Sequence, residues 1–211
     1  MKTIQAEPLA YAQAPDQAAF DTTAFLQSEL AEHRHVFEAT QAAIGSSFVR
    51  ACDLIETSIR CGGKLLTFGN GGSAADAQHI ASELVVRYKE HRGPIAAIAL
   101  TTDTSTLTAC GNDFGFDALF ARQVHALGRS GDVAIGISTS GHSPNVIEGL
   151  LQARRNGMRT IGMTGGAGGK MTELCDAVIS VPSRITARIQ EMHILIGHML
   201  CKALEKRLGL V

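Results

Sequence analysis

The chain has 211 residues, of which 45% are apolar and only 5% aromatic, with no tryptophan. This length suits one ordinary globular domain, and a core of alanine, valine, isoleucine and leucine suits helices packed closely on a sheet. The formal charge of −1, from 19 basic and 20 acidic residues, argues against a broad electrostatic footprint for nucleic acid, so we expect no nucleic-acid partner.

The five cysteines form no C-x-x-C pair and are odd in number. A disulfide framework or a thiolate zinc site is therefore not expected, and a cytoplasmic location fits better. The N-terminal segment shows no apolar stretch resembling a signal peptide, and no uninterrupted run of about 20 apolar residues occurs, so we expect no membrane span.

The first predicted elements lie before the sheet. Residues 1–19 are rich in alanine and glutamine and carry two prolines, which predicts a mobile arm. Two helical patterns follow, and in the second apolar residues recur every three or four positions from Ile44 to Ile59. Because residues 40–208 contain no linker composition, we expect residues 20–211 to form a single domain.

Apolar strand candidates and helical stretches then alternate along the chain. Strands are predicted at Lys64–Phe68, Ile95–Leu100, Asp132–Ser138, Arg159–Thr164 and Asp176–Val181. Helices are predicted at Ser73–Glu90, Asp117–Leu127, Pro144–Asn156 and Lys170–Cys175, with a long closing helix at Ile185–Leu208. This alternation predicts a parallel sheet with helices on both faces, and in such sheets ligands bind beyond the carboxyl ends of the strands.

The glycine loop Gly69–Ser73 (GNGGS) ends the first predicted strand and opens a helix. Glycines permit positive φ and close backbone approach, and Ser73 stands where a helix cap is expected. A plain strand-to-helix turn explains the loop equally well. The pattern also matches the relaxed dinucleotide fingerprint G-x-G-x-x-A, but the acid at the required spacing, Glu90, precedes the second strand, so a dinucleotide site is not favoured.

The helix after this loop carries His79 and Glu83 four residues apart, hence on one face, with Asp76 before them and Arg87 after them. An imidazole and a carboxylate one turn apart can share a metal ion. A surface pair without a metal is the commoner arrangement, so this spacing alone leaves both interpretations open.

The serine loop Ser138–Ser143 (STSGHS) gathers four hydroxyl side chains around one glycine after the third predicted strand. Ser143 can cap the next helix, and Pro144 suits its first position, where no N–H is needed. A helix N-terminus offers free N–H groups and a positive dipole end, so added hydroxyls make a phosphate cradle with little net charge. We therefore favour phosphate binding over a serine-rich turn.

Two further segments contain candidate residues. Gly165–Lys170 (GGAGGK) resembles a nucleotide-binding P-loop, but Thr164 and Met171 break the required frame, which leaves a flexible loop. The apolar closing helix carries five polar residues that need partners or a function: Arg188, Gln190, Glu191, His193 and His198. Helical geometry does not choose a ligand among them, so without further information buried histidines bonded to the backbone are the favoured interpretation.

Four motifs taken together resemble the phosphoheptose isomerases, a branch of the sugar-isomerase (SIS) domain family. They are GNGGSAADAQHIASEL, GNDFGF, GISTSGHSPNVI and RIQEMHILIGHML, and they cover about residues 61–205 in the family's order. The resemblance implies an α/β three-layer sandwich with a five-stranded parallel, flavodoxin-like sheet, N-terminal helices and a long C-terminal helix. It also implies a homotetramer with active sites at subunit interfaces.

The resemblance further implies a set of site residues. One Zn²⁺ per subunit would be held by His79, Glu83, Gln190 and His198. Substrate contacts would fall on Asn70, Gly71, Gly72, Ser73, Arg87, Asp113 and Gln190. Phosphate contacts would fall on Ser138, Thr139, Ser140 and Ser143. Ala187 and His142 depart from the family, which often has Asp and Asn at these two positions.

The implied reaction is an aldose–ketose isomerisation that converts D-sedoheptulose 7-phosphate to D-glycero-D-manno-heptose 7-phosphate, the first step of nucleotide-activated heptose biosynthesis. A proton moves between C1 and C2 through an enediol, and we assign Glu83 as the base and His198 as the acid. A metal would polarise the carbonyl and hydroxyl oxygens.

Two non-catalytic classes compete with this interpretation. One related branch has a similar last helix and is a tetrameric scaffold that binds a replication-initiation protein, but its positions matching Glu83 and His198 are typically other residues. Another senses sugar phosphates within transcription regulators, which normally carry a DNA-binding domain, and residues 1–40 are too few for an obvious one. The presence of Glu83 and His198 favours the enzyme.

Overall fold

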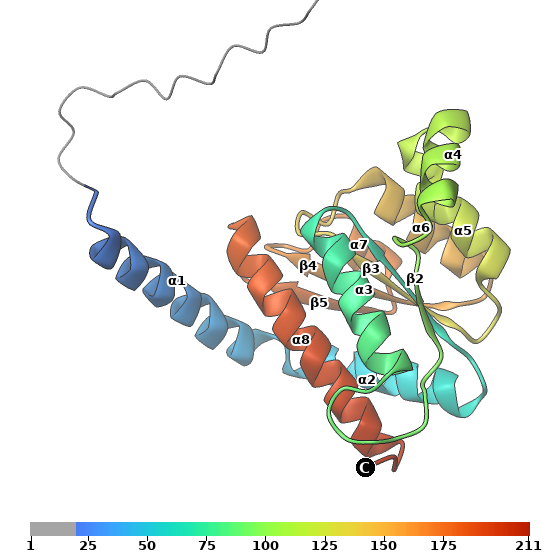
Figure 1. The fold of residues 1–211 in the computed structure, drawn as a ribbon, viewed down its shortest axis with the longest axis horizontal. Coiled ribbons are helices and arrows are strands. Elements are labelled where there is room, and N and C mark those ends of the chain that lie inside the picture. Colours follow the sequence, from blue (N-terminus) through green and yellow to red (C-terminus); the bar gives the residue numbers. More distant parts are fainter. Residues whose placement is uncertain (1–19) are drawn as a thin grey trace, which may run out of the picture.

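A computed structural model describes residues 20–211, so the predicted arm at residues 1–19 lies outside the described residues. Within the described range, five parallel strands form one sheet in the order β2-β1-β3-β4-β5 (Figure 1). They are β1 (Leu65–Gly69), β2 (Ala97–Ala99), β3 (Val133–Ile137), β4 (Arg159–Gly165) and β5 (Ala177–Val181). The predicted parallel sheet is confirmed, and this strand order is the flavodoxin-like one.

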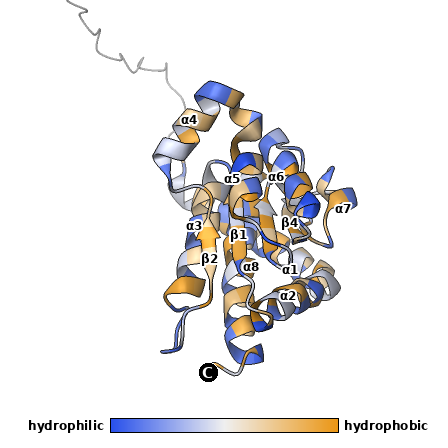
Figure 2. Ribbon diagram, turned by 90° about the vertical axis from the view of Figure 1, so that its right-hand side faces the viewer, coloured by the Kyte–Doolittle hydropathy of each residue, from blue (hydrophilic) through white to orange (hydrophobic). Residues whose placement is uncertain are grey.

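Helices cover both faces of the sheet and make the predicted three layers. One face is covered by α1 (Thr22–Ala43), α2 (Gly45–Arg60), α3 (Gly72–Val85) and α8 (Thr186–Arg207). The other face is covered by α5 (Leu119–Leu127), α6 (Pro144–Arg155) and α7 (Met171–Leu174). Neighbouring strand residues such as Leu65 and Leu66 enter opposite cores because side chains alternate along a strand. Figure 2 shows the resulting apolar sheet between helices with hydrophilic outer faces.

The order of the strands places a crevice at their carboxyl ends. After β1 the chain adds β2 on one side and then crosses to add β3 on the other. Such a reversal between adjacent strands separates the connections above them, and ligands of open α/β sheets bind there. The glycine loop follows β1 and the serine loop follows β3, so both predicted loops lie at this switch point.

Several predicted bounds are wrong. The helix predicted at Ser73–Glu90 begins at Gly72 and ends at Val85, and Gly71 holds the N-cap position, so Ser73 does not cap it. The stretch before β3 divides into a short 3₁₀ turn, η1 (Phe116–Ala118), and α5.

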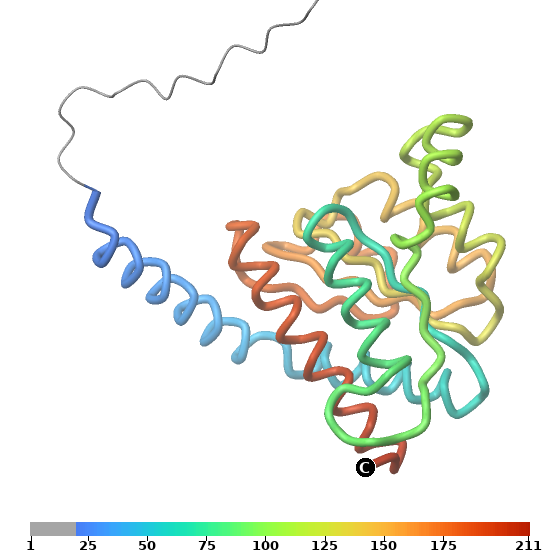
Figure 3. The backbone as a smooth tube through the Cα atoms, viewed as in Figure 1, coloured from blue at the N-terminus to red at the C-terminus, as the bar shows by residue number. Residues whose placement is uncertain are grey.

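Helix α4 (Thr104–Phe114) was not predicted. It is rich in threonine and has Cys110 as its one buried residue, so it lacks the apolar repeat that marks a core-facing helix. Figure 3 shows α4 projecting beyond the end of the sheet.

In the described part of the chain no helix is long and apolar enough to cross a membrane.

Candidate active site

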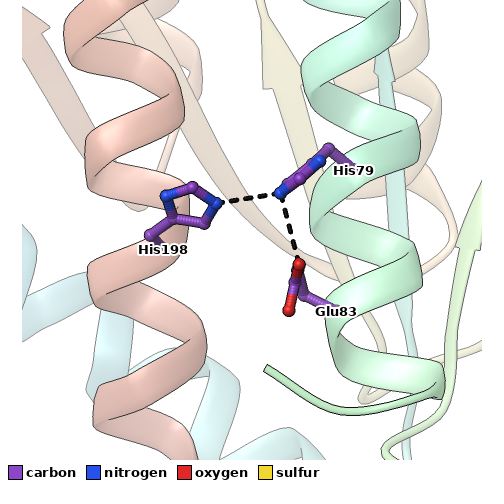
Figure 4. A group of neighbouring side chains, drawn as sticks. All are labelled: His79, Glu83 and His198. Atoms are coloured by element: carbon purple, nitrogen blue, oxygen red, sulfur yellow. Dashed lines mark hydrogen bonds and ion pairs between the residues drawn. The ribbon is translucent and has the colours of Figure 1, made fainter. Parts of the chain in front are cut away.

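A compact cluster of two histidines and one glutamate joins α3 to α8 (Figure 4). Helix α3 presents His79 and Glu83 on one face, one turn apart, and α8 packs alongside with His198 at the same level. The Nε2 atoms of His79 and His198 are 2.9 Å apart, and Nε2 of His79 lies 3.3 Å from Oε1 of Glu83. Two residues of α3 thus meet one residue of α8, which follows His79 by 119 positions in the sequence.

The spacing of these donor atoms fits a divalent cation. Ligands about 2.0–2.2 Å from a tetrahedral ion are separated from one another by roughly 3.3–3.6 Å. The 3.3 Å between His79 and Glu83 lies in this range, and the 2.9 Å between the two imidazoles is shorter, so a bound ion would require the rings to move slightly apart. The second oxygen of Glu83, Oε2, is buried without a hydrogen-bond partner in the described residues, which is costly for a carboxylate that has nothing to bind. Imidazole and carboxylate are the donors that zinc and similar ions prefer.

The fourth predicted ligand, Gln190, lies at the opposite end of α3. Its side-chain amide packs against Gly72, where a Cβ would collide with it. Gln190 precedes His198 by eight residues, or about 12 Å along the helix axis, so within one chain it lies beside the glycine loop and not beside the cluster. One chain therefore brings three of the four predicted ligands together.

The serine loop forms a small hydroxyl cluster over the N-terminus of α6. The Oγ of Ser138 lies 2.8 Å from that of Ser143 and 3.4 Å from that of Ser140. Ser143 takes the N-cap position as predicted but makes no side-chain cap bond, because its hydroxyl is paired with Ser138 instead. Pro144 begins the helix, and the free N–H groups of its first turn can receive an anion.

A pair of amides fastens the glycine loop to the serine loop. The side chains of Asn70 and Asn145 donate to each other at 2.8 Å in both directions. Asn145 is only 1% exposed, in the first turn of α6. Sequence reasoning did not single out Asn145, because a lone asparagine near a helix start is ordinary and only the fold shows its partner.

Three other predicted contacts occupy separate places. Ser73, the last residue of the glycine loop, is buried in the first turn of α3. Arg87 is exposed just beyond the end of α3, and Asp113 is exposed on α4, where Oδ1 accepts a bond from the side chain of Asn112. Arg87 and Asp113 face solvent in the single chain.

Two further groups lie near the cluster: the half-buried Asp76, which precedes His79 on α3, and the buried Cys201 on α8, which was not predicted. Burial raises the pKa of Asp76 to about 6, against the opposing effect of His79, and its Oδ2 has no partner in the described residues. Burial, together with the nearby carboxylates of Glu83 and Glu205, also raises the pKa of Cys201 to about 12. A cation bound at the cluster would offset the electrostatic cost of these acidic neighbours.

His193 is buried in α8 and serves the fold. Its Nε2 lies 3.0 Å from the carbonyl oxygen of Thr164 at the end of β4. Burial lowers the pKa of this imidazole from 6.5 to about 4, although the bond to Thr164 opposes the shift. Since the pKa is lower in the folded state, the unfolded state binds more protons in this range, and stability is lost as the pH falls from 6.5 toward 4.

We expect this single group to remove roughly 3 kcal/mol of folding stability across that pH window. His193→Gln keeps a donor for the Thr164 carbonyl but cannot take up a proton, so its stability should vary less with pH. Urea unfolding at several values between about pH 4 and 7 measures the difference between the two proteins. An equally steep loss of stability in the variant would contradict the assignment to His193.

Comparison with known proteins gives a consistent result. A family model described as SIS domain matches residues 30–165. A phosphoheptose isomerase from Paramagnetospirillum magneticum is 57% identical over 181 residues, which is 86% of this chain and 94% of that protein. The solved phosphoheptose isomerase from Neisseria gonorrhoeae is 44% identical with a TM-score of 0.82, over 87% of this chain and 98% of that one. The solved phosphoheptose isomerase from Francisella tularensis is 36% identical with a TM-score of 0.85, over 89% of this chain and 100% of that one.

Proposed function

Because the chain belongs to the phosphoheptose isomerases of the SIS domain family, we propose that it converts D-sedoheptulose 7-phosphate to D-glycero-D-manno-heptose 7-phosphate. The observation that carries this proposal is the meeting of His79, Glu83 and His198 from two helices. Purified protein supplied with Zn²⁺ and sedoheptulose 7-phosphate should form the aldose. No turnover under these conditions would move the chain to the class of non-catalytic binding scaffolds.

The residues of the cluster can perform the proton transfers of this isomerisation. Glu83 takes the proton from C1 of the open-chain ketose and delivers it to C2. His198 donates a proton to the C2 oxygen as the enediol forms and accepts one from the C1 oxygen as the enediol collapses. A Zn²⁺ ion held by His79, Glu83 and His198, one per subunit, would supply Lewis acidity toward the two substrate oxygens.

The serine loop acts at the other end of the substrate. Its hydroxyls and the first-turn N–H groups of α6 bind the 7-phosphate, which fixes one end of a flexible sugar. Restricting the chain in this way raises the chance that C1 and C2 reach Glu83 in the right orientation. The paired amides of Asn70 and Asn145 hold the start of α6, next to the serine loop, at a fixed distance from the glycine loop, which contacts the sugar.

We propose a homotetramer in which neighbouring subunits complete the sites. Gln190 lies away from the cluster of its own chain, and Arg87 and Asp113 are exposed, as residues that act in a neighbour's site would be. Helix α1 also exposes apolar side chains suited to a subunit contact: Phe25, Leu26 and Leu30.

Ser140→Ala should raise KM for the sugar phosphate by about 10-fold with little change in kcat, since a lost hydrogen bond to a charged group costs about 1.5 kcal/mol. The reason is that the phosphate is bound equally in the ground and transition states. Steady-state kinetics give both constants. Thr57→Ala, which removes a hydroxyl bonded within α2, is the matched control. An unchanged KM in Ser140→Ala would count against the cradle.

A further inference from the structure

A buried guanidinium closes the end of α3 beside the cluster of His79, Glu83 and His198. Arg92 donates from Nη2 to the carbonyl oxygen of Glu83 at 2.7 Å, and from Nη1 to that of Leu84 at 2.6 Å. The Arg92 side chain is fully buried. The last carbonyls of a helix have no partners within the helix, so Arg92 acts as the C-terminal cap of α3. One of the two capped residues is the proposed base and ligand, Glu83.

Arg92 is itself held by α8. Its Nε donates to Oε1 of Glu205 at 2.8 Å, and the backbone N–H of Tyr88 donates to the same oxygen at 3.1 Å. Glu205 is 2% exposed and follows His198 by seven residues, two helical turns along the same face. The ring of Tyr88 lies 5.5 Å from that of His198. The pair therefore joins the end of α3, the segment after it and the helix that carries His198.

Stability does not explain such a pair well. Removing two charges from water costs several kcal/mol per ion, and apolar pairs of similar volume are often as stable or more so. The pair instead restricts geometry, because the donors of a planar guanidinium have fixed directions and so set both the distance and the orientation of the groups that they bind. Here it fixes the helix end that carries Glu83 relative to the helix that carries His198.

We propose that Arg92 and Glu205 are positioning residues that set the separation of Glu83 and His198 and so determine the affinity of the cluster for divalent metal. This inference rests on the metal site of the proposed function. Neither residue touches the substrate, and their effect passes through the backbone of Glu83 and through the segment carrying Tyr88.

The test is a titration of metal-free, full-length protein with Co²⁺, followed by its visible absorption. Glu205→Gln and Arg92→Lys should each weaken Co²⁺ binding by about 10–100-fold, the usual effect of losing an outer-shell partner of a metal ligand. Asp132→Asn is the matched control. It breaks another buried ion pair, with Lys64 at 2.6 Å, at the amino edge of the sheet, so it should lower stability without changing Co²⁺ affinity.

Arg92→Met combined with Glu205→Leu removes both buried charges together, which preserves folding if a single change does not. Its affinity for Co²⁺ should also be lower than that of the wild type, because the carbonyl of Glu83 has lost its hydrogen-bond donor. Wild-type affinity in this double variant, or in both single variants, would overturn the inference. Failure of the wild type to bind Co²⁺ would instead overturn the metal site on which it rests.

Discussion

Glu83→Gln is expected to lower the isomerase rate by about 10²–10⁴-fold, the usual contribution of a positioned general base. The amide keeps the size of the side chain and an oxygen that can face the cluster, but it cannot accept the proton from C1. The variant should therefore fold, assemble and bind the sugar phosphate normally. Conversion of sedoheptulose 7-phosphate, measured beside substrate affinity, separates lost chemistry from lost binding.

Glu173→Gln, which neutralises an exposed carboxylate on α7, is the matched control and should retain full activity. Deuterium from the solvent should also enter C2 of the aldose in the wild-type reaction, because a proton held by Glu83 can exchange before it is delivered. Near-normal turnover in Glu83→Gln would exclude this residue as the base.

Removal of metal by a chelator is expected to lower turnover by at least about 10³-fold, since Lewis-acid stabilisation supplies several kcal/mol and 1.36 kcal/mol corresponds to a tenfold rate. The fold should persist, because the strands and both cores are formed without the cluster. Zn²⁺ added back should restore the activity. Circular dichroism and the isomerase assay on the same sample make the comparison.

His198→Asn should resist this rescue, because it removes both a ligand and the proposed acid. His125→Asn is its control, since His125 lies on α5, whose residues belong to the core on the other face of the sheet, and contacts Gln152 there. Full activity in chelated protein with no bound metal would rule out the metal in catalysis.

The sequence by itself determined the features that depend on residues close together along the chain. Strands of apolar residues were located to within two residues of their observed bounds, because strands buried on both faces of a parallel sheet are short, mostly apolar runs. His79 and Glu83 were placed on one face because four residues make about one helical turn. Pro144 was placed at a helix start because its ring suits only the first turn.

The helix ends were less predictable, and α3 shows why. Its polar and apolar pattern continues past Val85, yet the helix stops there because Arg92 folds back to take the carbonyls of Glu83 and Leu84. The donor comes from beyond the helix and is held by Glu205 on α8. No local pattern around Val85 carries that information.

Only the tertiary structure decided which distant residues meet. His198 reaches His79 across 119 positions because α3 and α8 pack side by side on one face of the sheet, and Asn145 reaches Asn70 because β1 and β3 are neighbours. The resemblance to a family named ligands, but the described chain places Gln190 at Gly72, about 12 Å along α8 from His198. Spacing in sequence fixes geometry within a helix, whereas distances between helices follow from how their side chains pack.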